Sequence, residues 1–423
     1  MSDQINSTLG ELVAAGGGII HTGPFGSQLH AADYVSEGIP CIMPANMKDN
    51  RVNLSGIAFI SDDDAKRLSK YLVQEGDIVY SRRGDVTAKA LIGINEVGYF
   101  CGTGCLLLRP GEKFDSNYLT YYLSTPRIQA WIISQAVGAT MPNLNTGILF
   151  RIPFTGPEKP IQEKISATLR SIDDKIDLNN RINAELEAMA KTLYDYWFVQ
   201  FDFPDANGKP YKTSGGKMEY NATLKRKIPV GWLASNILLL AELLGGGTPT
   251  KANSTYWNGS IPFFTPTDSG KNIYSLSTQD NITEVALKKS STRLFKKNTV
   301  FITARGSVGR LALNAVPMAM NQSCYALSTK QGVSFVFLYY LAKELIHHLE
   351  VKATGSVFNS IVSNDIEHTY LALPNNIKLI EEYAEKTEPL FEKIELLTKE
   401  NQQLAVLRDW LLPLLMNGQV TVK

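Results

Sequence analysis

The sequence is poor in the residues that build redox and metal sites, and it has no long apolar run. Only 4 cysteines and 5 histidines occur among its 423 residues. Cys41, Cys101, Cys105 and Cys324 form no C-x-x-C pair. Cys101 and Cys105 could share a metal, but thiols in or near strands of a reduced, cytoplasmic protein are favoured. No apolar run reaches the roughly 18 residues that span a bilayer, and the start lacks the pattern of a signal peptide.

The sequence also lacks the loops with which enzymes bind nucleotides. The glycine runs at 16–18 and 245–247 do not follow a strand in a G-x-G-x-x-G pattern, and no G-x-x-x-x-G-K-[ST] occurs. The histidines show no metal-ligand spacing. The acidic run 62–64 could bind a cation, but the basic residues beside it favour a solvated helix start. The sequence therefore predicts no catalytic residue, no metal and no cofactor bound by this chain.

Charge is present but unevenly distributed. The formal net charge of the chain is +1. Residues 208–375 alone carry 18 Lys and Arg against 9 Asp and Glu, whereas the segments on either side are net acidic. A basic block indicates either a polyanion partner or an ordinary solvated surface, and charge alone does not separate the two.

The chain repeats itself after about 220 residues. Three blocks return in the same order: Ile39-Pro40 at Ile261-Pro262, residues 71–92 at 293–313, and residues 118–143 at 337–359. Their shared order and spacing indicate a tandem duplication. Within each copy, short runs rich in Val, Ile, Tyr and Phe end at Arg-Gly, which is typical of a strand reaching a turn. Helical spacing follows in the third block, so each copy is predicted to be a small α+β module.

Each copy ends in a segment with an a/d heptad seam, which predicts a long helix. The first seam contains Ile165, Leu169, Ile172, Ile176, Asn179, Asn183, Leu186, Leu193 and Trp197. The second contains Leu390, Ile394, Leu397, Asn401, Leu404 and Leu411. The two seams can cover each other, most simply as an antiparallel coiled coil that relates the two copies by a pseudo-two-fold axis.

The length of these helices suits a spacer. About 38 residues make a rod of roughly 57 Å, the right order for separating two modules by one DNA turn of about 34–36 Å. Asn179, Asn183 and Asn401 at the seam would fix its register. Alternatively, they lie off-centre in solvent.

At this point the sequence resembles a known family. Residues 171–203, SIDDKIDLNNRINAELEAMAKTLYDYWFVQFDF, closely resemble the central conserved region of type I restriction–modification specificity subunits. Residues 23–40 and 245–262 resemble the two openings of that family's target-recognition domains. The resemblance covers nearly the whole chain. The stretch that often opens the family's helices is only partly kept at 157–162 and almost absent at 374–377.

The resemblance implies a domain organisation and a set of partners. It assigns residues 1–157 and 204–375 to two target-recognition domains, 158–203 to the central conserved helix and 376–423 to the C-terminal one. Each recognition domain would bind one half of a split, asymmetric target in double-stranded DNA. The helices would dock two methyltransferase subunits, and through them the restriction subunits. S-adenosylmethionine, ATP and Mg²⁺ would belong to those partners, because this chain also lacks the Asn/Asp-Pro-Pro-aromatic motif of an adenine methyltransferase.

DNA contacts are expected from cations at matched turns and from polar loops that differ between the copies. In the first copy the candidates are Arg82, Arg83, Lys89, Asn46 and Lys48. In the second they are Arg305, Arg310, Thr267, Lys271, Asn272, Lys288, Lys289, Lys296 and Lys297. The matched arginines suit phosphates, and the unmatched loops 43–51 and 265–280 suit base edges. A structural Arg-Gly turn, with its arginine paired to a carboxylate, is the alternative.

Two other functions compete with this interpretation. A duplicated scaffold that binds two proteins through its helices would explain the seams without sequence-specific DNA binding. A self-sufficient DNA-modifying enzyme is disfavoured by the missing motifs. Salt-dependent DNA affinity separates the first of these from a specificity subunit, because phosphate contacts weaken with salt.

Overall fold

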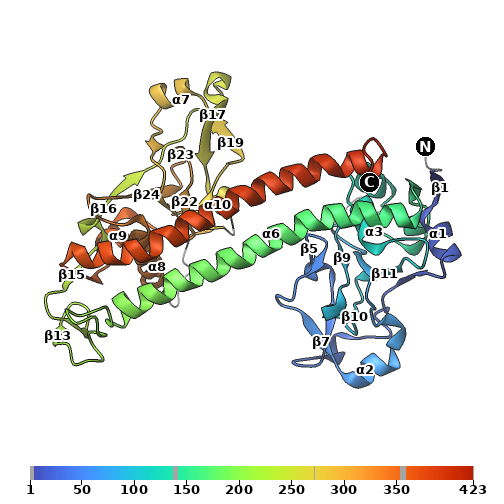
Figure 1. Ribbon diagram of the computed structural model, residues 1–423, viewed down its shortest axis with the longest axis horizontal. Coiled ribbons are helices and arrows are strands. Elements are labelled where there is room, and N and C mark those ends of the chain that lie inside the picture. The colour runs from blue at the N-terminus through green and yellow to red at the C-terminus, as the bar shows by residue number, and fades with distance from the viewer. Residues whose placement is uncertain (1–3, 137–141, 271, 353–358, 423) are drawn as a thin grey trace. The chain divides into compact units, whose positions relative to one another are not determined.

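The computed structural model describes residues 4–136, 142–270, 272–352 and 359–422. The chain forms two compact units (Figure 1). Unit 1 comprises Met1–Lys175 and Leu404–Lys423, and unit 2 comprises Ile176–Gln403. The two long helices, α6 (Lys159–Tyr194) and α10 (Ile377–Met416), therefore contribute residues to both units.

Unit 1 contains two four-stranded sheets. The first is antiparallel, in the order β2 (Ile19–Thr22), β11 (Cys105–Arg109), β8 (Ile78–Ser81), β9 (Lys89–Leu91). The second has the order β10 (Phe100–Cys101), β4 (Ile39–Ile42), β7 (Ala58–Ile60), β3 (Tyr34–Val35), with β10 parallel to β4. Val79, Ala90 and Leu107 of the first sheet share a core with Cys41 and Phe100 of the second.

Short elements complete unit 1. The hairpin of β5 (Met47–Lys48) and β6 (Arg51–Val52) turns at Asp49 and Asn50, whose φ angles of 52° and 60° are typical of a tight two-residue turn. The remaining elements are α1 (Leu9–Ala15), α2 (Asp62–Arg67), α3 (Ser116–Tyr122), α4 (Pro126–Gln135), α5 (Thr146–Phe150) and the β1 (Ile5–Thr8)–β12 (Pro153–Gly156) pair. The core of these helices also includes Ile165, Leu169, Leu415 and Met416 of the long helices.

Unit 2 repeats this arrangement of strands. Its first sheet has the order β16 (Ala241–Gly245), β24 (Cys324–Thr329), β21 (Val300–Thr303), β22 (Leu311–Asn314), β18 (Tyr274–Ser275). Its second has the order β19 (Asp280–Ile282), β17 (Trp257–Phe264), β23 (Met318–Met320), β20 (Leu294–Phe295), with β17 parallel to β23. In both units, the strand that contains Ile-Pro (β4 or β17) pairs in parallel with one neighbour and antiparallel with the other.

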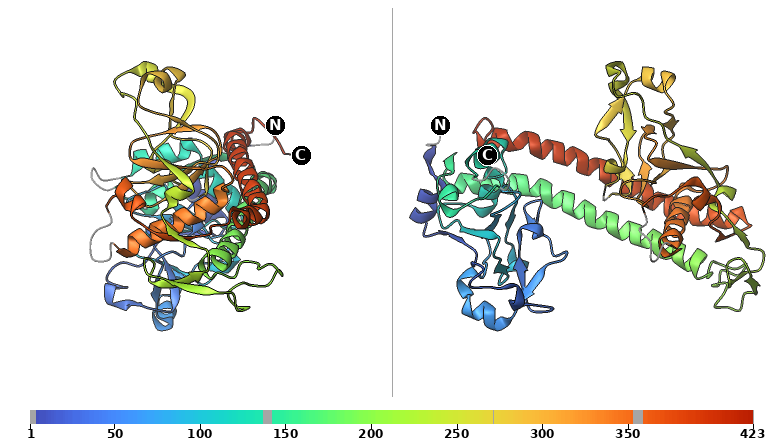
Figure 2. Two further views of the ribbon diagram at one scale, coloured as in Figure 1. Left: turned by 90° about the vertical axis from the view of Figure 1, so that its left-hand side faces the viewer. Right: turned by 180° about the vertical axis from the view of Figure 1, so that it is seen from behind.

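The other elements of unit 2 surround an aromatic core. They are α7 (Glu284–Lys289), α8 (Phe335–Lys352), α9 (Ser363–Glu367) and the β15 (Leu233–Ser235)–β25 (Leu371–Leu373) pair. The β13 (Met218–Asn221)–β14 (Arg226–Pro229) hairpin follows the end of α6 (Figure 2). Phe337, Tyr340, Tyr383 and Phe391 are fully buried in this core, which joins α8 to α10.

The two long helices contact each other in opposite chain order within unit 2. Tyr383 Oη donates to the Ala190 carbonyl at 3.0 Å, and farther along α10 Asn401 Oδ1 accepts from Asn179 Nδ2 at 2.9 Å. Asn179 is fully buried, so it lies between the helices rather than off-centre in solvent. Each of the predicted seam positions is buried or half-buried in the unit to which it belongs.

The end of α6 differs from the prediction. The expected helix continued to residue 203, but the α-helix ends at Tyr194 and a π-helical turn follows over Asp195–Val199. This turn buries Trp197 and Phe198 together, and Phe201 then adopts a φ of 68°, which ends helical geometry. The aromatic residues of this stretch therefore serve the core of unit 2 and do not extend the helix.

Candidate nucleic-acid interface

In unit 1 the Arg-Gly sequence forms a tight loop between β8 and β9. Ser81 anchors the loop: its amide donates to the Ala88 carbonyl at 2.9 Å, and its hydroxyl donates to the Arg83 carbonyl at 2.9 Å. Gly84 has a φ of 76°, a conformation that favours glycine. Asp85 closes the far side of the loop by accepting hydrogen bonds from the amide and the hydroxyl of Thr87.

The corresponding loop of unit 2 lies between β21 and β22 and has the same construction. The Thr303 amide donates to the Arg310 carbonyl at 2.9 Å, and its hydroxyl donates to the Ser307 carbonyl at 2.6 Å. Gly306 has a φ of 66°. Ser81 and Thr303 are equivalent, since a hydroxyl at the end of the strand ties the loop back in each unit.

These loops present arginines to solvent. Arg83 and Arg305 are exposed, and among the described residues no carboxylate forms an ion pair with either. Arg82 is half-buried, with its guanidinium 5.8 Å from the centre of the Phe25 ring. Arg310 is exposed and donates to the Ser269 carbonyl at 3.2 Å, which holds the loop against the polar segment 265–270. An exposed guanidinium beside a glycine suits contact with a phosphate.

Two candidates of the first copy point inward. Asn46 is only 2% exposed, and its amide group donates to the Asn53 carbonyl and accepts from the Met43 amide. Lys89 is 3% exposed, with Nζ 5.8 Å from the centre of the Tyr80 ring. Burial lowers the pKa of Lys89 to about 8, against a smaller opposing effect of Asp85. As placed, neither side chain can reach DNA, and we correct both assignments. Lys48 is exposed on β5.

The candidates of the second copy fall into two groups. Thr267 and Asn272 are exposed in the segment that Arg310 contacts, and Lys271 lies outside the described residues. Lys288 and Lys289 are exposed in the last turn of α7, and Lys296 is exposed in the turn between β20 and β21.

Lys297 has a partner that the sequence does not indicate. Its Nζ lies 2.8 Å from Oε2 of Glu395 on α10, so this lysine connects the turn to the long helix. Sequence reasoning missed Glu395 as a partner, because the two residues are distant in the chain. It also missed Phe25, an exposed aromatic ring beside Arg82, and the exposed Arg293 near Lys296. The only sequence signal for Arg293 was its place in the basic run that ends at Lys297.

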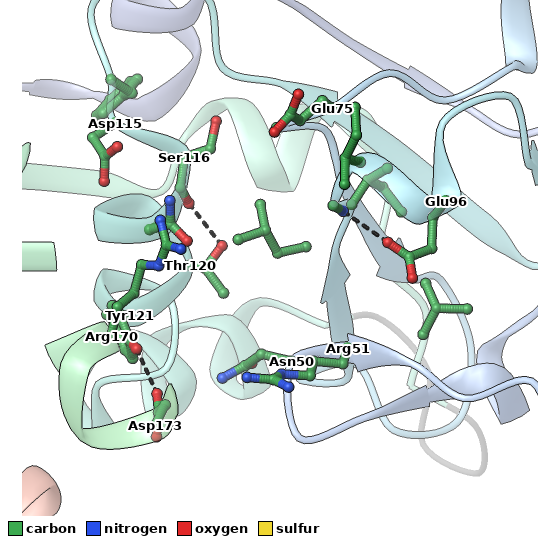
Figure 3. A pocket seen from close by; sticks show the side chains of 18 of the residues that line it. Asn50, Arg51, Glu75, Glu96, Asp115, Ser116, Thr120, Tyr121, Arg170 and Asp173 are labelled. Carbon is green, nitrogen blue, oxygen red and sulfur yellow. Dashed lines mark hydrogen bonds between the residues drawn. The ribbon is translucent and has the colours of Figure 1, made fainter. Parts of the chain in front are cut away.

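A cavity of about 780 Å³ lies in unit 1 between the β5–β6 turn, α3 and α6 (Figure 3). Carboxylates outnumber cations in its lining, which includes Glu75, Glu96 and Asp115. Tyr121 points to Asp173 of α6 and donates a hydrogen bond to it (Figure 3). Arg408 of α10 donates to the other oxygen of Asp173 at 2.9 Å. This acidic lining does not suit a phosphate backbone, although the cavity borders the end of the 43–51 loop.

The structure offers little for redox or metal chemistry. Burial raises the pKa of the Cys41 and Cys324 thiols to about 12, so both are protonated near neutral pH. No group of His, Cys, Asp and Glu side chains among the described residues is arranged to hold a metal ion. The acidic run 62–64 opens α2, where Asp64 pairs with Arg67 at 2.6 Å. In the described part of the chain, no helix is long and apolar enough to cross a membrane.

Two segments of the chain, residues 8–188 and 229–406, match the family model described as the type I restriction modification DNA specificity domain. The chain belongs to this family. The matched segments include both Arg-Gly loops and most of both long helices. As a specificity subunit, the chain is a non-catalytic component and not an enzyme by itself.

Similar proteins cover nearly all of the chain. The type I restriction enzyme MjaIX specificity subunit of Methanocaldococcus jannaschii is 25% identical over 399 residues, which is 92% of this chain and 89% of that protein. The HindI specificity subunit of Haemophilus influenzae is 22% identical over 83% of this chain and 88% of its own. The crystal structure of a type I S subunit from M. genitalium has a TM-score of 0.57 at 16% identity, covering 98% of this chain and 96% of that one. That likeness supports the fold.

Proposed function

We propose that this chain recognises a bipartite, asymmetric target in double-stranded DNA, with one recognition domain for each half. Family membership supports DNA recognition. The observation that carries the two-part target is the pair of Arg-Gly loops. In each loop a hydroxyl at the end of the strand donates to a carbonyl of the loop, and Arg83 and Arg305 are exposed at the same strand end. Matched cations position two modules on phosphates in the same way, while the unlike polar loops beside them read different bases.

The two long helices act in this proposal as an antiparallel coiled coil that sets the gap between the two half-sites. The opposite chain order of the α6–α10 contacts in unit 2 supports it, as does the hydrogen bond between the buried Asn179 and the half-buried Asn401. A polar pair in an apolar seam disfavours slipped registers, because a slip would remove the partner of the buried Asn179 amide group. The shared strand order supports a tandem repeat with pseudo-two-fold symmetry.

The outer faces of these helices dock two methyltransferase subunits, which in turn bring the restriction subunits. Exposed apolar side chains support this assignment: Val406 and Trp410 in unit 1 are 66% and 60% exposed, and Met189 and Leu396 in unit 2 are exposed as well. Isolated apolar residues on a surface are common, but Val406 and Trp410 lie one helical turn apart, and aromatic and Met side chains are enriched in protein interfaces. S-adenosylmethionine, ATP and Mg²⁺ belong to those partners, and the assembly acts in the cytoplasm.

Methylation mapping tests the proposal directly. DNA from cells that express the cognate methyltransferase subunits is mapped with and without this chain. We expect a split motif with two unlike halves and a fixed gap, present only with the chain. A soluble complex that leaves DNA unmethylated and binds it without salt dependence would favour the scaffold function instead.

Arginine variants extend this test to the loops. Arg83→Ala or Arg305→Ala should weaken DNA binding for all sequences and lower the salt dependence by about one counterion each. Lys251→Ala, a control on an exposed lysine of unit 2 that is not among the candidate DNA contacts, should leave DNA affinity and its salt dependence unchanged. If Arg83→Ala altered the bases of one half-site while the salt dependence stayed the same, the phosphate assignment would be wrong.

A further inference from the structure

We propose that Glu395 is a positioning residue that fixes the orientation of the second recognition domain on α10, and thereby the number of base pairs between the two half-sites. This inference rests on the proposed function, since a gap has meaning only for a split target. It concerns a contact at the base of the domain, away from the Arg-Gly loop.

Glu395 is a carboxylate held between two cations. Its side chain is only 5% exposed. One oxygen lies 2.8 Å from Nζ of Lys297, in the turn between β20 and β21, and the other accepts from Lys399 on α10 at 2.6 Å. Burial alone would raise the pKa of Glu395, but the hydrogen bonds from Lys297 and Lys399 lower it below its ordinary value. The carboxylate therefore stays charged and keeps both partners.

Two further polar contacts connect α10 to the same recognition domain. Ser334, at the start of α8, donates to Glu388 at 2.8 Å, and Gln402 donates to Ser277 at 3.3 Å. Glu395 lies between Glu388 and Gln402 along the helix. The domain is thus held at three successive positions of α10, and the ion pair is the strongest of the three contacts because both of its partners are charged.

Apolar packing at this junction is extensive but does not by itself fix an angle. Phe391 and Ile394 are buried against the domain. Burial of apolar surface is non-directional, so a domain can tilt slightly without losing much of it. Short charge-assisted hydrogen bonds are sensitive to distance and angle. A shift of about 3.4 Å at the DNA-contacting end, one base-pair step, is enough to change the gap.

The test uses the full chain reconstituted with its methyltransferase subunits. Once the wild-type target is mapped, methylation rates are measured on DNAs in which the gap is one base pair shorter, unchanged or one longer. For Glu395→Gln we expect the rate on altered gaps, relative to the native gap, to rise by about tenfold or more, with both half-site sequences unchanged. Glu392→Gln is the control, because Glu392 is exposed on the same helix one turn earlier; it should retain the wild-type preference.

Lys297→Met separates positioning from DNA contact. Its side chain is half-exposed, so the substitution is compatible with folding. We expect the same relaxed gap preference as for Glu395→Gln, and no further relaxation in the double variant, because both remove one interaction. If Lys297 instead contacts a phosphate, Lys297→Met will weaken binding on every DNA and lower its salt dependence while the gap preference stays unchanged, and that result overturns the inference.

The two levels of the proposal fail in different ways. A wild-type complex that methylates no split motif contradicts the proposed function itself. A wild-type complex with one preferred gap that both Glu395→Gln and Lys297→Met retain contradicts only the role of Glu395. Thermal unfolding of each variant complex shows whether a changed preference accompanies a folded protein.

Discussion

The two units have a similar arrangement of strands but are attached to the long helices by different chemistry. In unit 2, Phe391 of α10 lies among four aromatic rings, with centroid distances of 6.4 Å to Tyr274, 6.2 Å to Phe335, 5.9 Å to Tyr339 and 6.0 Å to Tyr340. The ion pair of Lys297 and Glu395 closes the same junction. The attachment in unit 2 is therefore an apolar core with a buried carboxylate that pairs with a half-exposed lysine.

In unit 1 the equivalent position is polar. Asp173 corresponds to Phe391, because it follows the seam residue Ile172 as Phe391 follows the seam residue Leu390. The carboxylate of Asp173 accepts hydrogen bonds from Tyr121 and Arg408, whereas Phe391 packs against aromatic rings. An open cavity of about 780 Å³ adjoins it. Two units with similar strand arrangements thus use either packing or hydrogen bonding at the corresponding position, with neighbouring residues that differ accordingly. The two junctions should respond differently to substitution, salt and pH.

The largest expected effect is the loss of the apolar junction. Phe391→Ala should destabilise unit 2 by about 3–5 kcal/mol, since it removes a fully buried ring and leaves a cavity. Hydrogen exchange resolved by segment measures this: amides of β21 in unit 2 should exchange faster, while those of β8 in unit 1 stay protected. Equal loss of protection in β8 would show that the two junctions are not independent. Glu392→Ala, on the exposed side of the helix, should change the amide exchange of neither β21 nor β8.

A smaller effect is expected at Lys89, whose place at the start of β9 is taken in β22 by Leu311. A lysine with a pKa of about 8 when folded and 10.5 when unfolded binds fewer protons in the folded state between these values. Stability of the wild type should therefore rise with pH from about 8 to 10.5, relative to Lys89→Leu. At pH 7 the variant should be more stable by up to about 3 kcal/mol. Denaturant unfolding at pH 7 and pH 10 tests this, and a constant difference between the two proteins would contradict it.

The smallest effect is expected at the polar junction. Asp173→Asn should cost about 1–2 kcal/mol, because the amide weakens the charge-assisted bonds from Tyr121 and Arg408. The cost should shrink in about 1 M salt, which screens the half-exposed Arg408. Exchange protection of α3 at low and high salt measures it. The destabilisation of unit 2 by Phe391→Ala should not depend on salt, because it arises from lost apolar packing. If that destabilisation also shrank in salt, the two junctions would not differ in the way described.

Much of the fold could be predicted from local sequence patterns. The a/d spacing indicated α6 and α10, and the Arg-Gly ends of two apolar runs located two turns that the structure builds with equivalent hydrogen bonds. These features depend on residues close together in sequence. The predicted end of α6 was wrong, because Trp197 and Phe198 are buried in the core of unit 2. Helical periodicity in the sequence does not reveal this burial.

The surroundings of three candidate residues could not be predicted, for a common reason. Asn46, Lys89 and Lys297 are polar residues in or beside short strands, where the side chain can face either way. Lys89 pairs with Tyr80 across β8 and β9 and faces the core with it. Lys297 meets a carboxylate that lies about a hundred residues away along the chain. Residue type indicates what a side chain can bind, but the tertiary fold decides what it faces.

The sharing of the long helices between units has a consequence for synthesis on the ribosome. Leu415 and Met416 are buried in the core of unit 1, so this core is complete only after the C-terminal part of α10 has been made. A chain that terminates before α10 therefore lacks these two residues in the core of unit 1 and Phe391 in the core of unit 2. Two incompletely packed cores make such a chain a substrate for chaperones and proteases.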